Sequence, residues 1–197
     1  MLDSKDVQAY SNSILVMAAL ALIAGCGGKT PVPRPEAFLA PYVVTPEKVV
    51  VEMLRLAEVG KDDVVYDLGS GDGRIVILAA KLYGARGVGF DLDASLVAQA
   101  RANARRTGVA HLAEFRNQDV LTVDPSPATV VTIYLSPDAN LKLRAALRTR
   151  LRPGARVVSH EFDMGDWPPD AVRRFPDELG AVGTLYLWRI PASPTKP

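Results

Sequence analysis

A glycine-rich turn lies in the segment VVYDLGSGDGRIVILAA, which runs from Val64 to Ala80. Gly69, Gly71 and Gly73 occupy alternate positions between an apolar run and a segment with apolar periodicity. Glycine permits backbone dihedrals that other residues avoid, and it lets a ligand approach the main chain without meeting a Cβ atom. The spacing therefore predicts a strand that turns into a helix around a small ligand.

The glycine spacing distinguishes this turn from a dinucleotide-binding turn. Its pattern is G-x-G-x-G, and Gly73 is followed by Arg74 and Ile75, so the third glycine of the dinucleotide pattern G-x-G-x-x-G is missing. Asp67 lies inside the strand just before the turn. A carboxylate there repels a pyrophosphate and attracts a ligand with a positive charge, such as a sulfonium that also carries an amino group. The turn therefore disfavours a nicotinamide-dependent dehydrogenase.

Two further acids fall at the ends of the next predicted strands. Asp91 lies about twenty residues past the glycines, where a carboxylate accepts hydrogen bonds from ribose hydroxyls. Asp119 follows the third strand in the segment NQDV, where it can meet an adenine amino group. Together with Asp67 and the glycine turn, these acids predict a site for S-adenosylmethionine. The predicted cofactor-binding residues are Thr45, Asp67, Gly69, Gly71, Gly73, Asp91 and Asp119.

Helical and strand patterns alternate from Thr45 onward. The first helix is predicted to begin with Thr45 as its N-cap and Pro46 at its first position, and to end at Gly60. Further helices are expected at 73–82, 94–107 and 138–151, and strands at 63–69, 87–91, 112–117, 129–135 and 155–162. Antiparallel strands at 172–175 and 183–190 complete the prediction. This order indicates an α/β fold with a mostly parallel sheet, helices on both faces and a ligand crevice beyond the carboxyl ends of the strands.

Several segments resemble the class I S-adenosylmethionine-dependent methyltransferases. DLGSGDGR, GVGFDLD and NQDV are similar to the first three motifs of that class. More narrowly, TPEKVVVEML, IYLSPDANLKLRAAL and GARVVSHEFDMGDW resemble the small protein-lysine methyltransferases of the archaeal broad-specificity and mitochondrial ATP-synthase c-subunit type. The resemblance implies a Rossmann-like, seven-stranded sheet with an antiparallel C-terminal strand. It also implies S-adenosylmethionine as methyl donor and lysine side chains of a protein partner as acceptors.

The same resemblance implies where the acceptor site lies. Class I enzymes place the residues beside the transferred methyl group at the end of the fourth strand. The residues at the ends of the fourth and fifth strands are Tyr134, Leu135, Ser136, Pro137, Ser159, His160 and Phe162. We expect Tyr134, Ser136 and His160 to be catalytic or to position the substrate. A core aromatic and a hydrogen-bonded structural residue are the alternatives for Tyr134 and His160.

An apolar segment with a distinctive end occupies residues 1–28. Ile14 to Ala24 is an unbroken apolar run of eleven residues, which fits a signal sequence and is shorter than the roughly 20 residues of a spanning helix. It is followed by Cys26, in the segment LIAGCGG, which resembles the lipidated cysteine of bacterial lipoproteins. We expect membrane association through this segment, by a lipoprotein-like signal or by an anchor on the cytoplasmic face. An unmodified, buried Cys26 and a start placed too far upstream are the alternatives.

The remaining domain boundaries follow from composition. Prolines at 31, 33, 35 and 41 favour an extended linker over residues 29–44. The methyltransferase domain is predicted at 45–191, and residues 192–197 form a tail. A tether of this kind would hold the domain near the membrane.

Charge and composition restrict the classes of partner. The chain has 23 Lys and Arg against 22 Asp and Glu, a formal net charge of +1, so no basic surface argues for a nucleic acid partner. One cysteine and two histidines are too few for a convincing metal set, and we expect no metal. A small-molecule methyltransferase and a lipoprotein that keeps the fold only to bind a ligand remain alternative functions. The sequence indicates no particular oligomeric state.

Overall fold

Seven strands form one sheet in the computed structural model, in the order β3-β2-β1-β4-β5-β7-β6. The structure describes residues 43–176 and 182–192. Neighbouring strands from β3 to β5 run parallel, whereas β7 is antiparallel to both β5 and β6. The predicted α/β fold, with a mostly parallel seven-stranded sheet and an antiparallel C-terminal strand, is therefore confirmed.

The strands and helices have the following bounds. The strands are β1 (Val64–Leu68), β2 (Arg86–Asp91), β3 (Ala113–Asn117), β4 (Val130–Ile133), β5 (Arg156–His160), β6 (Ala171–Pro176) and β7 (Val182–Arg189). The helices are α2 (Glu47–Leu56), α3 (Arg74–Tyr83), α4 (Ala94–Arg106) and α5 (Pro137–Arg150), with the short 3₁₀ helix η2 (Val120–Thr122) between β3 and β4. Each predicted helix and strand is present, with bounds that differ by a few residues.

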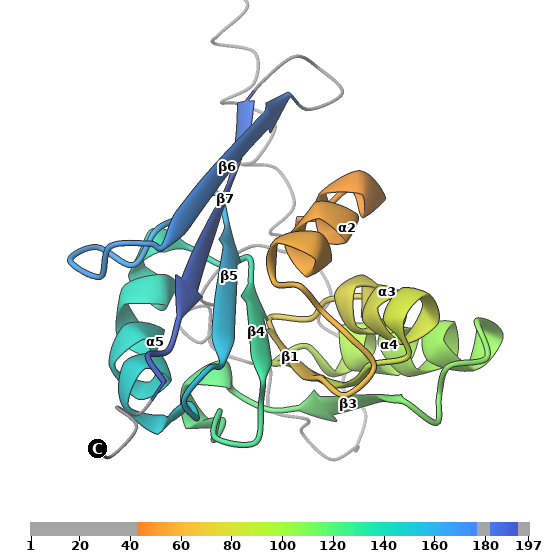
Figure 1. The fold of residues 1–197 in the computed structure, drawn as a ribbon. Helices are drawn as coiled ribbons and strands as arrows, with labels where there is room; N and C mark the ends of the chain where they lie inside the picture. Colours follow the sequence, from red (N-terminus) through yellow and green to blue (C-terminus); the bar gives the residue numbers. More distant parts are fainter. Residues whose placement is uncertain (1–42, 177–181, 193–197) are drawn as a thin grey trace, which may run out of the picture. The chain divides into compact units, whose positions relative to one another are not determined.

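Helices α2, α3 and α4 cover one face of the sheet, and α5 covers the other (Figure 1). Successive residues of a strand point to opposite faces. Val65 of β1 accordingly packs in the core cluster with α2 and α3, while Tyr66 and Leu68 pack in the cluster that contains Leu143 of α5. Because both faces are buried, the central strands are almost continuous apolar runs. Asp67 is the acidic exception within β1.

Strands β4 and β5 end earlier than the sequence predicted. β4 ends at Ile133 and β5 at His160. The next residue after β5, Glu161, has a φ of 66°, a left-handed conformation that is uncommon for a residue other than glycine and that ends the extended strand. Tyr134 and Leu135 consequently lie in the loop beyond β4 instead of inside the strand.

The first helix begins one residue later than predicted. The N-cap of α2 is Pro46 and not Thr45, and no side chain caps this helix. Thr45 is buried, and its carbonyl oxygen accepts a hydrogen bond of 2.7 Å from Nη1 of Arg74. The residue that was expected to cap α2 therefore connects the start of the domain to the glycine-rich turn.

The predicted signal or anchor segment at 1–28 lies outside the described residues. So do residues 29–42 of the predicted linker and all but the first residue of the predicted tail at 192–197. Within the described part of the chain, no helix combines the length and the apolar character needed to cross a membrane. The membrane association predicted for residues 1–28 remains a prediction.

Candidate active site

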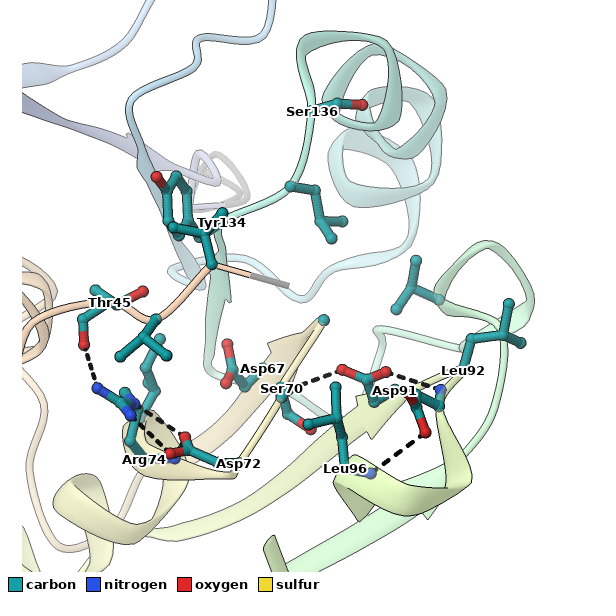
Figure 2. A pocket seen from close by; sticks show the side chains of 18 of the residues that line it. Thr45, Asp67, Ser70, Asp72, Arg74, Asp91, Leu92, Leu96, Tyr134 and Ser136 are labelled. Atoms are coloured by element: carbon teal, nitrogen blue, oxygen red, sulfur yellow. Dashed lines mark hydrogen bonds and ion pairs between the residues drawn. The ribbon is translucent and has the colours of Figure 1, made fainter. Parts of the chain in front are cut away.

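A cavity of about 620 Å³ lies where the carboxyl ends of β1, β2 and β4 meet (Figure 2). Its volume is typical of a site for a small molecule or a cofactor. Of the predicted site residues, those that line the cavity are Thr45, Asp67, Gly69, Gly71, Asp91, Asp119, Tyr134 and Ser136. Gly73 and His160 are not among the lining residues. The structure thus brings most of the predicted cofactor and acceptor residues to one crevice.

Asp67 is the most buried acid of the cavity, with 2% of its surface exposed. Its Oδ1 accepts a hydrogen bond of 2.8 Å from the hydroxyl of Thr132. Burial raises the pKa of Asp67 to about 7, the bond from Thr132 opposes this shift, and the carboxylates of Asp91 and Asp72 add to it. A cationic ligand would stabilise the ionised form of Asp67. The buried end of the cavity therefore favours a positive charge.

Asp91 connects the end of β2 to the glycine-rich turn. Its Oδ2 accepts a hydrogen bond of 2.8 Å from the N–H of Gly71, and its Oδ1 accepts one of 2.9 Å from the N–H of Asp93. Gly69 and Gly71 have φ values of 87° and 51°, in the left-handed region that glycine adopts readily. Each carboxylate oxygen of Asp91 has a further lone pair for a ligand hydroxyl. Asp91 therefore holds the turn and also presents acceptors to the cavity.

Asp119 and Ser70 bring further polar atoms to the cavity. Asp119 begins η2, and its Oδ1 accepts a hydrogen bond of 2.9 Å from the N–H of Leu121. The Oγ of Ser70 is buried and has no hydrogen-bond partner among the described residues. A buried hydroxyl without a partner is destabilising by about 1–3 kcal/mol. We expect a bound ligand to satisfy it.

Arg74 joins the glycine-rich turn to the segment ahead of α2. Its Nε and Nη2 donate to the two carboxylate oxygens of Asp72 at 2.9 and 2.6 Å, while Nη1 donates to the carbonyl oxygen of Thr45 (Figure 2). Val43 and Val44 of the same segment line the cavity. No sequence pattern predicted this connection, because it joins residues 29 positions apart through a backbone oxygen.

Tyr134 forms the cavity wall beyond β4 and packs against His160, with ring centroids 4.2 Å apart. His160 itself is buried. Burial raises the pKa of Tyr134, and the carboxylate of Glu161 adds to this shift. Burial lowers the pKa of His160, while Glu161 opposes that change. Both rings are therefore neutral at pH 7.

Ser136 has a structural role that the sequence did not predict. It is the N-cap of α5, and its Oγ accepts a hydrogen bond of 3.2 Å from the N–H of Ala139. Its place in the cavity lining agrees with the prediction, but the capping bond occupies one acceptor position of the hydroxyl. A catalytic role for Ser136 remains a prediction.

Gly73 is required by packing at the start of α3. It is the N-cap residue of α3, with a φ of 84°. A Cβ atom at this position would lie 2.6 Å from the ring of Phe115 and 2.8 Å from the Cβ of Ala100. Gly73 therefore has a role in helix packing, and its predicted contact with the cofactor remains a prediction.

Replacing Gly73 by Ala is expected to lower the free energy of unfolding by about 2–4 kcal/mol. About 1–2 kcal/mol comes from the left-handed backbone, and the rest comes from the clash with Phe115 and Ala100. Gly108→Ala is a matched control, because Gly108 has a φ of 76° but a Cβ atom there would meet no other atom within 4 Å. The control should lose only the backbone contribution. Urea denaturation of both variants measures the difference, and equal losses would contradict the packing role.

Comparison with known proteins identifies the family. The sequence model of the ANTKMT methyltransferase domain matches residues 67–171. A protein-lysine N-methyltransferase from Saccharolobus islandicus is 46% identical over 152 residues, which cover 76% of this chain and 93% of that protein. The chain belongs to this methyltransferase family. The methyltransferase is also 39% identical to the lysine N-methyltransferase of the ATP synthase C-subunit from Xenopus laevis, over 75% of this chain and 62% of that protein.

A solved structure indicates the cofactor of the methyltransferase. It is an RNA methyltransferase from Salinibacter ruber in complex with S-adenosyl-L-homocysteine, 54% identical, with a TM-score of 0.71. The match covers 79% of this chain and 98% of that one. S-Adenosyl-L-homocysteine is what S-adenosylmethionine becomes when it gives up its methyl group. The methyltransferase is therefore S-adenosylmethionine-dependent, as predicted.

The residues of the cavity fit this cofactor. The buried acid Asp67 suits the positive charges of the methionine part, Asp91 has lone pairs for ribose hydroxyls, and the unsatisfied Oγ of Ser70 is available as a further partner. The left-handed glycines leave the main chain of the turn accessible. Within 43–176 and 182–192, no three His, Cys, Asp or Glu side chains are grouped so that they could hold a metal ion.

Proposed function

We propose that the methyltransferase N-methylates lysine side chains of a protein held at a membrane. The observation that supports the lysine acceptor best is the placement of Tyr134 in the wall of the cofactor cavity, in a chain that matches 93% of the length of a protein-lysine N-methyltransferase. A neutral aromatic wall is suited to the long aliphatic stem of a lysine.

The chain's own residues have three tasks in such a reaction. When bound, S-adenosylmethionine supplies a methyl group on a positively charged sulfur. Asp67 would hold the positively charged methionine part of the cofactor, Asp91 would hold its ribose, and Tyr134 would align the acceptor amine with the methyl group. Such alignment can supply much of the rate enhancement of a displacement reaction. A lysine reacts only as the neutral amine, and burial next to Tyr134 favours that form by desolvation.

RNA is the second candidate acceptor, because the Salinibacter ruber relative is described as an RNA methyltransferase. The charge of the chain argues against it. Proteins that bind nucleic acids neutralise phosphates with clustered Lys and Arg, whereas this chain has a formal net charge of +1. We therefore favour a protein acceptor.

The proposed membrane location rests on the N-terminal sequence. The apolar run of eleven residues from Ile14 to Ala24 would enter the membrane, and the proline-containing linker would keep the domain near its surface. A tether of this kind raises the effective concentration of acceptors in the same membrane. A lipidated Cys26 is one form of the anchor, and an uncleaved apolar segment is the other.

Labelled methyl groups distinguish these acceptors directly. Purified full-length protein and S-adenosylmethionine with a radioactive methyl group are incubated with the membrane and soluble fractions of a cell extract. We expect the label in protease-sensitive, ribonuclease-resistant material of the membrane fraction, and more label as pH rises below the pKa of the acceptor lysine. Label only in RNA or in small molecules would contradict the lysine proposal, and label only in soluble proteins would contradict the membrane location.

A further inference from the structure

Four side chains next to the cavity wall form a cluster, namely Tyr134, His160, Glu161 and Phe175. Nε2 of His160 lies 3.1 Å from Oε1 of Glu161. The ring of His160 has two aromatic neighbours, Tyr134 at 4.2 Å and Phe175 of β6 at 6.3 Å between ring centroids. The cluster combines residues from the loop after β4, from the end of β5 and from β6, which are far apart in sequence.

Glu161 is held in an unusual backbone conformation. Its φ is 66°, and non-glycine residues in this region are enriched at functional sites. Its N–H donates to the carbonyl oxygen of Thr184 at 2.8 Å, and its Oε1 accepts from the N–H of Thr184 at 3.3 Å. These bonds to β7 fix the carboxylate next to His160.

His160 has one ring nitrogen with no partner. The residue is 6% exposed, and its Nδ1 has no hydrogen-bond partner among the described residues. With a hydrogen on Nε2 shared with Glu161, Nδ1 of the neutral ring carries a lone pair. A buried acceptor without a donor is destabilising, because it has lost its hydrogen bonds to water and gained none in the protein. A ligand that donates to it would remove this penalty.

We propose that Tyr134, His160 and Glu161 form the subsite that receives the primary amine of the acceptor. The cluster presents an aromatic face, an unpaired lone pair and a carboxylate, and an alkylammonium ion is the ligand whose donors and charge match all three. After the ammonium ion has lost a proton to solvent, an N–H bond from the neutral amine to Nδ1 orients the lone pair of the amine nitrogen. This assignment rests on the proposed lysine acceptor, and it adds Glu161, which neither the cavity lining nor the sequence indicated.

Binding of a small lysine analogue tests the subsite without requiring turnover. The probe is Nα-acetyl-L-lysine amide, added to the full-length protein saturated with S-adenosyl-L-homocysteine and followed by NMR titration. Glu161→Gln removes the charge with little change in shape, and we expect it to raise the dissociation constant of the probe about tenfold. Nα-acetyl-L-norleucine amide, which lacks the amine, should bind weakly to both proteins.

Glu58→Gln is the matched control. Glu58 is also an acid with a positive φ, 52°, but its side chain pairs with Arg189 at 2.7 Å, and its carbonyl oxygen accepts from Arg156, at the opposite end of β5 from His160. This variant should bind the probe like the unmodified protein. His160→Phe is a second test, because it keeps a ring against Tyr134 but removes Nδ1, and it should also weaken binding about tenfold.

The outcomes separate this subsite from the proposed function. Equal binding of the probe by Glu161→Gln and unmodified protein, with S-adenosyl-L-homocysteine affinity retained, would overturn the subsite. So would equal binding of the lysine and norleucine analogues. If the binding tests succeed but the protein methylates no lysine, only the proposed function is contradicted. If the protein methylates lysine and Glu161→Gln leaves kcat/KM unchanged, only the subsite is contradicted.

Discussion

Replacing Asp67 by Asn is expected to weaken S-adenosylmethionine binding at least about a hundredfold and, at pH 8, to stabilise the cofactor-free protein by roughly 4 kcal/mol. The carboxyl of Asp67 has a pKa of about 7 in the folded protein and roughly 3.9 in the unfolded chain. Each pKa unit of this difference corresponds to about 1.36 kcal/mol that ionisation of Asp67 costs the folded protein, and Asn avoids this cost because it does not ionise. The loss of affinity follows because the ionised carboxylate of Asp67 attracts the cationic cofactor, and the neutral amide of Asn cannot replace this attraction. One substitution should therefore improve stability and remove function.

The stability gain should depend on pH in a defined direction. A carboxyl with a raised pKa contributes most to stability below pH 4, and this contribution is lost as pH rises through 7. The gain from Asp67→Asn should therefore fall from roughly 4 kcal/mol at pH 8 to about 1.5 kcal/mol at pH 5. Thermal unfolding should show a rise of about 10 °C at pH 8.

Exposed Asp124 provides the control for these measurements. It pairs with Ser126 and Arg150 at the surface, away from the cavity lining, and Asp124→Asn should leave cofactor affinity unchanged. Calorimetric titration gives the affinities. An Asp67→Asn protein that binds the cofactor normally, or that unfolds at or below the original temperature at pH 8, would contradict the role assigned to Asp67.

Replacing Asp91 by Ala is expected to lower cofactor affinity by more than about a hundredfold. The sequence alone suggested only the loss of bonds to ribose hydroxyls. In the structure, Asp91 also accepts the N–H groups of Gly71 and Asp93, so its removal releases the turn as well. Losing charge-assisted hydrogen bonds, each worth about 1.5–3 kcal/mol, accounts for an effect of this size.

Asp91→Asn separates the two contributions of Asp91. The amide keeps one acceptor oxygen and loses the charge, so it can hold one of the two backbone N–H groups. We expect an affinity between those of the Ala variant and the unmodified protein, with little change in thermal stability. Calorimetry with S-adenosylmethionine measures both variants, and an Ala variant with unchanged affinity would remove Asp91 from the cofactor site.

The sheet and the cofactor end of the site could be predicted from the sequence because both depend on local patterns. Apolar periodicity located the strands, and the acids at their carboxyl ends converge on one edge of a parallel sheet. Asp67, Asp91 and Asp119 therefore could be chosen before their distances were known. The same reasoning overestimated the length of β4 and β5, because apolar residues such as Tyr134 and Leu135 continue beyond the last ladder pairs.

The acceptor end depends on contacts that no local pattern reveals. Glu161 reaches His160 because the chain takes a left-handed turn after β5 and because β7 returns antiparallel beside it. Arg74 reaches the carbonyl oxygen of Thr45, which any residue type could supply. Gly73 was assigned to the cofactor because its spacing matched the neighbouring glycines, and local spacing could not reveal its packing against the ring of Phe115 from β3. Tertiary packing decides such roles.

The identity of the atom that receives the methyl group tests the proposed lysine methylation most directly. Purified full-length protein is incubated with S-adenosylmethionine that carries a deuterated methyl group and with the proteins of the membrane fraction, and tryptic peptides are mapped by tandem mass spectrometry. We predict deuterated methyl groups on Nζ of lysine in one or a few proteins, and none when Asp67→Asn replaces the unmodified enzyme. Deuterated methyl groups on carboxylates or on RNA, or no transfer to any lysine, would contradict lysine methylation by this enzyme.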